Sequence, residues 1–104
     1  MDTLKKDWKL FRERISDWQE NYMEKLTKEY ITLLSGDEPA SKKFWELESR
    51  IKMDKRRPGV LLRLDKGEMT YHIVMLIRDG AIDFKDLDDF SDELKEEVQR
   101  ILQW

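Results

Sequence analysis

The first third of the chain carries large apolar side chains at the spacing of an α-helix. Starting at Leu4 they recur at alternating intervals of four and three residues: Leu4, Trp8, Phe11, Ile15, Trp18 and Tyr22. This spacing places them along one stripe of a helix. After Tyr22 the phase of the pattern changes, and the apolar positions continue at Met23, Leu26, Tyr30, Leu33 and Leu34. We predict one helix from about Thr3 to Ser35, with Thr3 as N-cap and Gly36 just beyond its end.

A second helix is predicted to follow a short loop. It should begin between Asp37 and Ala40, with Asp37 as the cap and Pro39 in the first turn. Its apolar stripe is again spaced by four, three and four residues: Ala40, Phe44, Leu47 and Ile51. Pro58 and Gly59 are expected to end the helix, because proline and glycine both interrupt helical structure.

The segment from Val60 to Leu64 is the part whose conformation the pattern leaves open. Its sequence, VLLRL, fits a short strand, a helical turn or a buried connector. A glycine follows it and β-branched residues occur over 70–74, so a small β-hairpin at about 60–75 is one alternative. The other interpretation is a helix from Glu68 to Asp79, with its apolar face at Met69, Ile73, Leu76 and Ile77. We favour the helix, because a lone hairpin beside helices is marginally stable.

The C-terminal quarter predicts a short turn and then a final helix. Asp83 is expected to cap the turn, which contains Phe84 and Leu87. Ser91 is expected to cap the last helix. Its apolar face is formed by Leu94, Val98, Ile101 and Leu102.

Together these elements predict an all-α fold: a small, elongated bundle of about four helices with a long N-terminal helix, forming a single domain over residues 1–104. A first helix of this length would extend about 50 Å. A compact chain of this size has a radius of gyration of about 13 Å, so a straight helix would project beyond the rest of the molecule. We expect an elongated bundle that dimerises, and a break in the helix near Tyr22 is the alternative.

Composition narrows the class of protein. Charged residues make up 41% of the chain and apolar ones 39%, with four Trp, three Tyr and four Phe, which is too apolar for a disordered polymer. The chain has no cysteine, which excludes disulfides and thiolate chemistry. It also lacks an apolar run of the length of a signal peptide or membrane span. These features predict a cytoplasmic protein with no membrane association.

The residues that most often carry chemistry are sparse. His72 is the only histidine, and Glu68 is the carboxylate one helical turn before it. We expect a structural role for His72, because no second ligand or nucleophile accompanies this pair. The acidic segment 83–97 does not match a calcium loop, since Phe90 and Ser91 stand where a ligand and a glycine are required. The glycines are isolated rather than clustered in a phosphate-binding loop. We therefore expect no catalytic residues, metal or cofactor, and a protein that is not an enzyme.

The middle of the chain is basic. Residues 42–66 hold nine Lys or Arg against four Asp or Glu. This segment is a candidate for nucleic-acid contact, through Arg50, Lys52, Lys55, Arg56, Arg57 and Arg63. The competing interpretation is a set of solvated cations that face the acidic segment 83–97. That acidic segment would be repelled by phosphates, which argues against DNA reading by a helix-turn-helix around Gly80.

Large aromatic side chains are the strongest indication of a partner, because they anchor many protein interfaces. The candidates for such an interface are Trp8, Phe11, Trp18, Tyr22, Trp45 and Trp104. We predict a regulatory or accessory protein that acts by protein–protein interaction, as a homodimer or with another protein. Nucleic-acid binding through residues 42–66 is the alternative. The architecture resembles that of small bacterial helical proteins such as immunity proteins, and this resemblance involves no residue-level motif.

Overall fold

The fold is all-α, as the sequence predicted. The computed structural model describes the backbone of residues 2–104 and the side chains of residues 3–104. The α-helices in this range are α1 (Asp2–Leu34), α2 (Ala40–Asp54), α3 (Met69–Arg78) and α4 (Asp92–Leu102). Two short 3₁₀ helices join them: η1 (Lys66–Glu68) and η2 (Phe84–Leu87). Residues 2–104 contain no strand, so the alternative of a hairpin at 60–75 is wrong.

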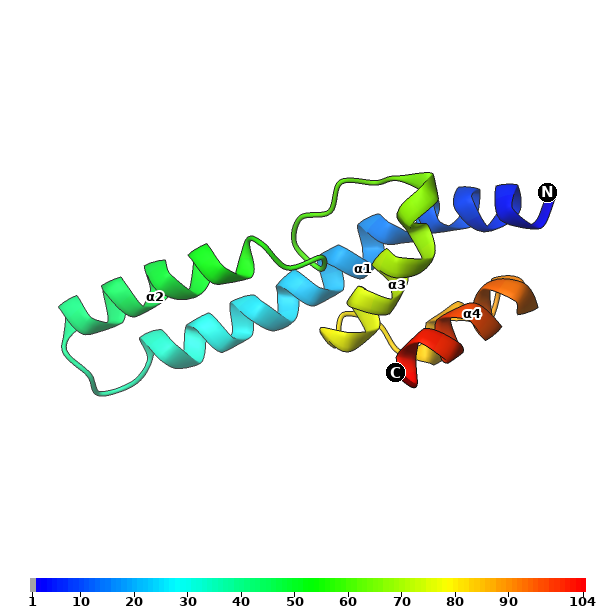
Figure 1. Ribbon diagram of the computed structural model, residues 1–104. Helices are drawn as coiled ribbons and strands as arrows, with labels where there is room; N and C mark the ends of the chain where they lie inside the picture. Colours follow the sequence, from blue (N-terminus) through cyan, green and yellow to red (C-terminus); the bar gives the residue numbers. More distant parts are fainter. Residues whose placement is uncertain (1) are drawn as a thin grey trace.

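Helix α1 runs through the whole length of the molecule without interruption. It contains 33 residues and shows no break at Tyr22, so the alternative of a broken first helix is wrong. The molecule measures 56 × 25 × 19 Å, and its radius of gyration is 16.5 Å. Figure 1 shows the consequence: α3 and α4 gather beside the N-terminal half of α1, and α2 lies alone along its C-terminal half. The predicted elongation is therefore confirmed.

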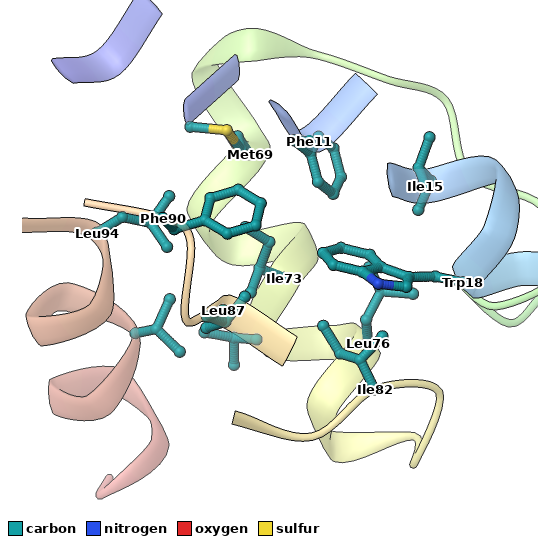
Figure 2. Close-up of a cluster of buried hydrophobic side chains, with 12 residues drawn as sticks. Phe11, Ile15, Trp18, Met69, Ile73, Leu76, Ile82, Leu87, Phe90 and Leu94 are labelled. Atoms are coloured by element: carbon teal, nitrogen blue, oxygen red, sulfur yellow. The ribbon is translucent and has the colours of Figure 1, made fainter. Parts of the chain in front are cut away.

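The hydrophobic core lies between the N-terminal half of α1 and the elements from α3 to α4. Phe11, Ile15 and Trp18 on α1 point toward Ile73 and Leu76 on α3, as Figure 2 shows. The core is completed by Met69, Val74, Ile82, Leu87, Phe90, Leu94 and Val98. Burying a side chain of this size contributes roughly 1.5–3 kcal/mol, so this cluster is the main source of stability.

The change of phase after Tyr22 has a structural explanation. From Phe11 to Tyr22 the apolar stripe of α1 is buried, whereas Leu4 at its start is exposed, and beyond Tyr22 the next buried residue on the helix is Leu26. At Tyr22 the chain passes against the returning backbone at Gly59, where a Cβ atom would stand 2.3 Å from the tyrosine ring. The phase of the apolar pattern changes because α1 packs against the core elements before Tyr22 and against α2 beyond it. The helix itself stays regular.

The ambiguous segment after Gly59 is a connector. Residues 61–65 have no regular secondary structure, and Leu62 packs partly against the core. The Asp65 carboxylate accepts a 2.8 Å hydrogen bond from the Gly67 backbone N–H, and the chain then enters η1 and α3. The predicted helix over 68–79 is confirmed, and its residues Met69, Ile73, Val74 and Leu76 are buried.

Some of the predicted helix ends are confirmed and others are wrong. Ser91 caps α4 by accepting a 3.1 Å hydrogen bond from the N–H of Leu94, and Asp83 stands at the N-cap of η2, where its N–H bonds the Asp86 carboxylate. Thr3 lies inside α1 and is not its N-cap.

The boundaries of α2 also differ from those predicted. Its N-cap is Pro39, and no side chain caps it, so the assignment of Asp37 as the cap is wrong. The helix ends at Asp54, before Pro58 and Gly59, and turns occupy the residues between. Gly36 follows the end of α1 as expected but lacks the left-handed conformation, which in the described chain occurs only at Gly80, with φ of 78°.

Candidate interaction surfaces

The most distinctive surface belongs to a two-helix arm. We define the arm as residues 23–54, which comprise the C-terminal third of α1, a short loop and α2. Figure 1 shows it extending away from the core, with α2 packed along α1 and no further layer of helix. A pair of helices buries only one stripe of each, so the remaining faces of both helices are left to solvent or to a partner.

A network of polar contacts joins the two helices of the arm. The Tyr30 hydroxyl donates a 2.5 Å hydrogen bond to Oδ2 of Asp54. Arg50 bonds Glu29 at 2.7 Å and stands 3.5 Å from the Asp54 carboxylate. The guanidinium of Arg50 also lies over the Tyr30 ring, 5.4 Å from its centroid. Arg57 donates to Oδ1 of Asp54 at 3.1 Å, so this carboxylate is the centre of the network.

The network alters the acidity of its members. Burial of Asp54 disfavours its charged form, but hydrogen bonds from Tyr30 and Arg57 together with the charge of Arg50 outweigh burial and lower the pKa of Asp54. Burial and the hydrogen bond to the carboxylate raise the pKa of Tyr30 to about 12. Asp54 is therefore ionised and Tyr30 is protonated at neutral pH.

This polar seam determines which face of α2 turns inward, and it corrects the prediction for that helix. The half-buried and buried residues of α2 are Lys43, Leu47, Arg50 and Asp54. The predicted stripe shares only Leu47 with this set. Its other large members are exposed, Phe44 by 62% and Ile51 by 39%. Partners for Arg50 and Asp54 on α1 rotate the helix so that much of its apolar stripe faces outward.

The solvent-exposed sides of α2 are rich in large apolar side chains. Trp45 and Met53 are exposed by 63% and 61%, in addition to Phe44 and Ile51. Phe44 and Trp45 pack edge to face, with ring centroids 5.0 Å apart, so the two rings support each other's orientation. We call Phe44, Trp45, Ile51 and Met53 the α2 apolar surface.

The remaining exposed apolar side chains are distributed more widely. In α1 the arm adds Ile31 and Leu34. Other exposed large apolar residues lie at the start of α1, on the connector, on α3, on η2 and at the C-terminus, and they are Leu4, Leu61, Leu64, Tyr71, Phe84 and Trp104. The arm is thus the place where such side chains are most concentrated on one pair of neighbouring elements.

The six aromatic residues suggested as an interface are divided by the fold. Phe11, Trp18 and Tyr22 are buried inside the chain, so the structure assigns them to internal packing. Trp8 is half-buried at the edge of the core. Trp45 and Trp104 are exposed. Sequence reasoning missed Met53, which lies outside the regular stripe; the signal for it was the presence of large apolar residues on several sides of one short helix.

The six basic residues suggested for nucleic-acid contact do not form one continuous patch. Arg50 and Arg57 are held by the Asp54 network, and Lys52 pairs with Glu48 at 3.7 Å. Lys55, Arg56 and Arg63 make no ion pair with the described side chains. They are spread over the turns after α2 and the connector.

The acidic segment 83–97 does not neutralise these cations. Its ion pairs with described residues are formed with Arg14, Lys95 and Arg100. The nearest approach to the expected contact is a 3.6 Å pair between Arg57 and Asp79, which lies before that segment. The basic middle and the acidic end of the chain therefore form no ion pair with each other among the described residues.

Residues 3–104 contain no group of three His, Asp or Glu placed to hold a metal ion. His72 is half-buried on α3, and its Nδ1 atom has no hydrogen-bond partner, not even Glu68. Asp7 is buried, but its carboxylate already accepts two hydrogen bonds from Ser91. The backbone N–H of Ser91 donates at 2.9 Å and its hydroxyl at 2.6 Å.

Comparison with protein-family models, with curated proteins and with solved structures finds no match to this chain. Within residues 2–104, no helix is both long enough and apolar enough to cross a membrane. Functional inference therefore depends on the surfaces described above.

Proposed function

We propose that this protein acts through protein–protein contact and that its arm binds the arm of a second copy, forming a homodimer. The observation that carries this proposal is the α2 apolar surface, which lies on an element with neighbours on one side only. Two antiparallel helices that meet a symmetry-related pair make a four-helix arrangement, a common way for helical hairpins to bury a second face.

The size of the aromatic pair supports a self-association surface. Large aromatic side chains expose about 150–250 Å² when free, so Phe44 and Trp45 together offer about 250 Å² in each copy. A symmetric dimer would bury about 500 Å² from these four rings. A standard interface buries about 1,600 Å² in total, of which roughly 900 Å² is apolar, so the rings would supply about half of the apolar area.

The charge of the arm also suits a second copy. Residues 23–54 contain six basic and seven acidic side chains, interspersed along both helices. Two such arms approach without the repulsion that a surface of a single sign would produce. A strongly acidic or basic partner gains no steering from this nearly neutral surface.

Sedimentation velocity at micromolar concentration tests the proposal. We expect the wild-type chain to sediment as a dimer and the double variant Phe44→Glu/Trp45→Glu to sediment as a monomer, since two charges would be buried at the interface. Trp104→Glu is the matched control, because Trp104 is 85% exposed and lies outside the arm. This control should remain dimeric.

Two results would contradict the proposal. One is a wild-type chain that stays monomeric over the whole concentration range. The other is a dimer that survives the double substitution while circular dichroism shows that the variant has kept its helical content.

Nucleic-acid binding through residues 42–66 has less support. The ion pairs of Arg50, Lys52 and Arg57 occupy half of the proposed contacts. Binding unaffected by Arg56→Glu/Arg57→Glu would exclude this segment as the site.

A further inference from the structure

A second surface, at the opposite end of α1 from the arm, is lined almost entirely by cations. It is a shallow groove of about 500 Å³ formed by the first turns of α1 together with Lys66 of η1. Its lining residues are Lys5, Lys6, Trp8, Lys9, Arg12 and Lys66. We call it the Trp8 groove. Five of its six residues are basic, although the whole chain has a net charge of −3.

The cations of the Trp8 groove are not neutralised by the described side chains. None of the five forms an ion pair with residues 3–104. Asp7 lies in the same turns of α1, but its carboxylate is buried and bonded to Ser91. Glu13, one turn beyond Lys9, shares this side of the helix without forming a described ion pair. The fold thus turns an acid inward and leaves its basic neighbours outside.

The groove lining includes a pair of flat groups, the Trp8 indole and the Arg12 guanidinium. The Arg12 guanidinium lies over the Trp8 indole, 5.5 Å from the ring centroid. Trp8 is half-buried, and its ring is 6.0 Å from that of Phe11, which is fully buried in the core. Packing against Phe11 helps to hold the indole in place, and Arg12 lines the groove beside it.

We propose that the Trp8 groove binds single-stranded nucleic acid. The lysines on either side would contact successive phosphates, and a base would stack on the Arg12–Trp8 pair. This inference is independent of the proposed dimer, because the groove and the arm share no residues.

Other polyanions fit the groove less well. An anionic membrane requires a broad exposed apolar face for insertion, and the apolar side chain of this groove is a half-buried indole. An acidic peptide would use the lysines but would leave the flat Arg12–Trp8 pair without a planar group to stack on it. A nucleic-acid strand is the polyanion that uses both features.

Fluorescence anisotropy with a labelled single-stranded oligouridylate of about 12 nucleotides, a typical site length for such proteins, tests the proposal. We expect the association constant to fall as salt is added. A plot of its logarithm against the logarithm of salt concentration should have a slope of about −2 to −3.5, which corresponds to three to five phosphate contacts at about −0.7 each. An abasic strand of equal length and charge should bind at least about fivefold more weakly, since it lacks stacking.

Charge reversal identifies the site. Lys5→Glu/Lys9→Glu should weaken binding by about tenfold or more, since two phosphate contacts become repulsive. Lys55→Glu/Arg56→Glu changes the net charge by the same amount, at exposed residues outside the groove, and should weaken binding much less. An equal loss in both variants would overturn the proposal, as would equal affinity for the abasic strand. Binding to phosphatidylserine vesicles or to polyglutamate, without binding to the oligouridylate, would also overturn it.

Discussion

Tyr30 on α1 and Asp54 on α2 are joined by a 2.5 Å hydrogen bond that ties the two helices of the arm together. The carboxylate of Asp54 is almost entirely buried, and it also bonds Arg57 and lies beside Arg50. A buried carboxylate is stable only with such partners. This one residue therefore links the end of α2 to α1 and to the turn that leads back to the core.

The lowered pKa of Asp54 predicts an acid-sensitive stability. A carboxylate whose pKa is lower in the folded state than in the unfolded state stabilises the protein above the unfolded pKa, near 4. That contribution is lost as the pH falls through the folded value. Urea unfolding measured from pH 7 to pH 2 should show a decline at acidic pH that is shallower in Asp54→Asn. Identical pH profiles for both proteins would contradict the assignment.

At neutral pH the same substitution should be costly. Asp54→Asn removes the negative charge that Arg50 and Arg57 face, and a lost charged hydrogen-bond network of this kind costs about 2 kcal/mol in the free energy of unfolding. Glu48→Gln is a suitable control, because Glu48 is an exposed acid on the same helix and, among the described side chains, its ion pair is with Lys52. It should change the unfolding free energy by less than about 0.5 kcal/mol.

Tyr30 predicts an effect at the alkaline end of the pH range. Its pKa is raised to about 12, so the folded state holds the phenol proton more tightly than the unfolded state does. Stability from this group is complete below about pH 10 and is lost as the pH rises toward 12. Tyr30→Phe should cost about 1.5–3 kcal/mol at pH 7, because the lost hydrogen bond is made to an ionised carboxylate. The difference between this variant and wild type, measured by urea unfolding, should shrink above pH 10; a constant difference would be inconsistent with the raised pKa.

The contacts of Ser91 predict that its substitution destabilises the first turn of α4. Its hydroxyl caps the helix at Leu94 and bonds the buried Asp7 carboxylate. Ser91→Ala removes both contacts and should cost about 1–2 kcal/mol in the free energy of unfolding. Amide hydrogen exchange should report faster exchange in the first turn of α4, and unchanged protection there would show that another group caps the helix.

The close approach of Gly59 to Tyr22 predicts a steric clash when Gly59, at the base of the arm, is replaced by a larger residue. A Cβ atom at this position would stand 2.3 Å from the Tyr22 ring, which is buried and has little room to move. Gly59→Ala should destabilise the protein by about 1–3 kcal/mol through overpacking. Gly36→Ala is the control, because the nearest atom there is the Leu33 carbonyl oxygen at an ordinary 3.5 Å. Equal melting temperatures for the two variants would contradict the close packing of Tyr22 on Gly59.

The candidate sites were only partly predictable. Trp45 and Trp104 were recognised as possible contact residues and are exposed, whereas Phe11 and Trp18 have the same chemistry and are buried. Large aromatic side chains serve interiors and interfaces equally well, so composition alone does not separate the two. The Trp8 groove was missed, because Lys5 and Lys9 alternate with acidic residues along a helix whose charges appear balanced.

The sequence by itself determined that this chain is helical and where its C-terminal elements begin. Apolar spacing and side-chain caps such as Ser91 act within a few residues, and such local interactions can be recognised from the order of the residues alone. Only the tertiary structure decided which helix faces meet. Periodicity shows that Phe44 and Ile51 share a face but not what that face contacts, and the distant partners of Asp54 turn the face outward. The burial of Asp7 and the approach of Lys66 to α1 are likewise long-range contacts, which is why the Trp8 groove exists only in the folded chain.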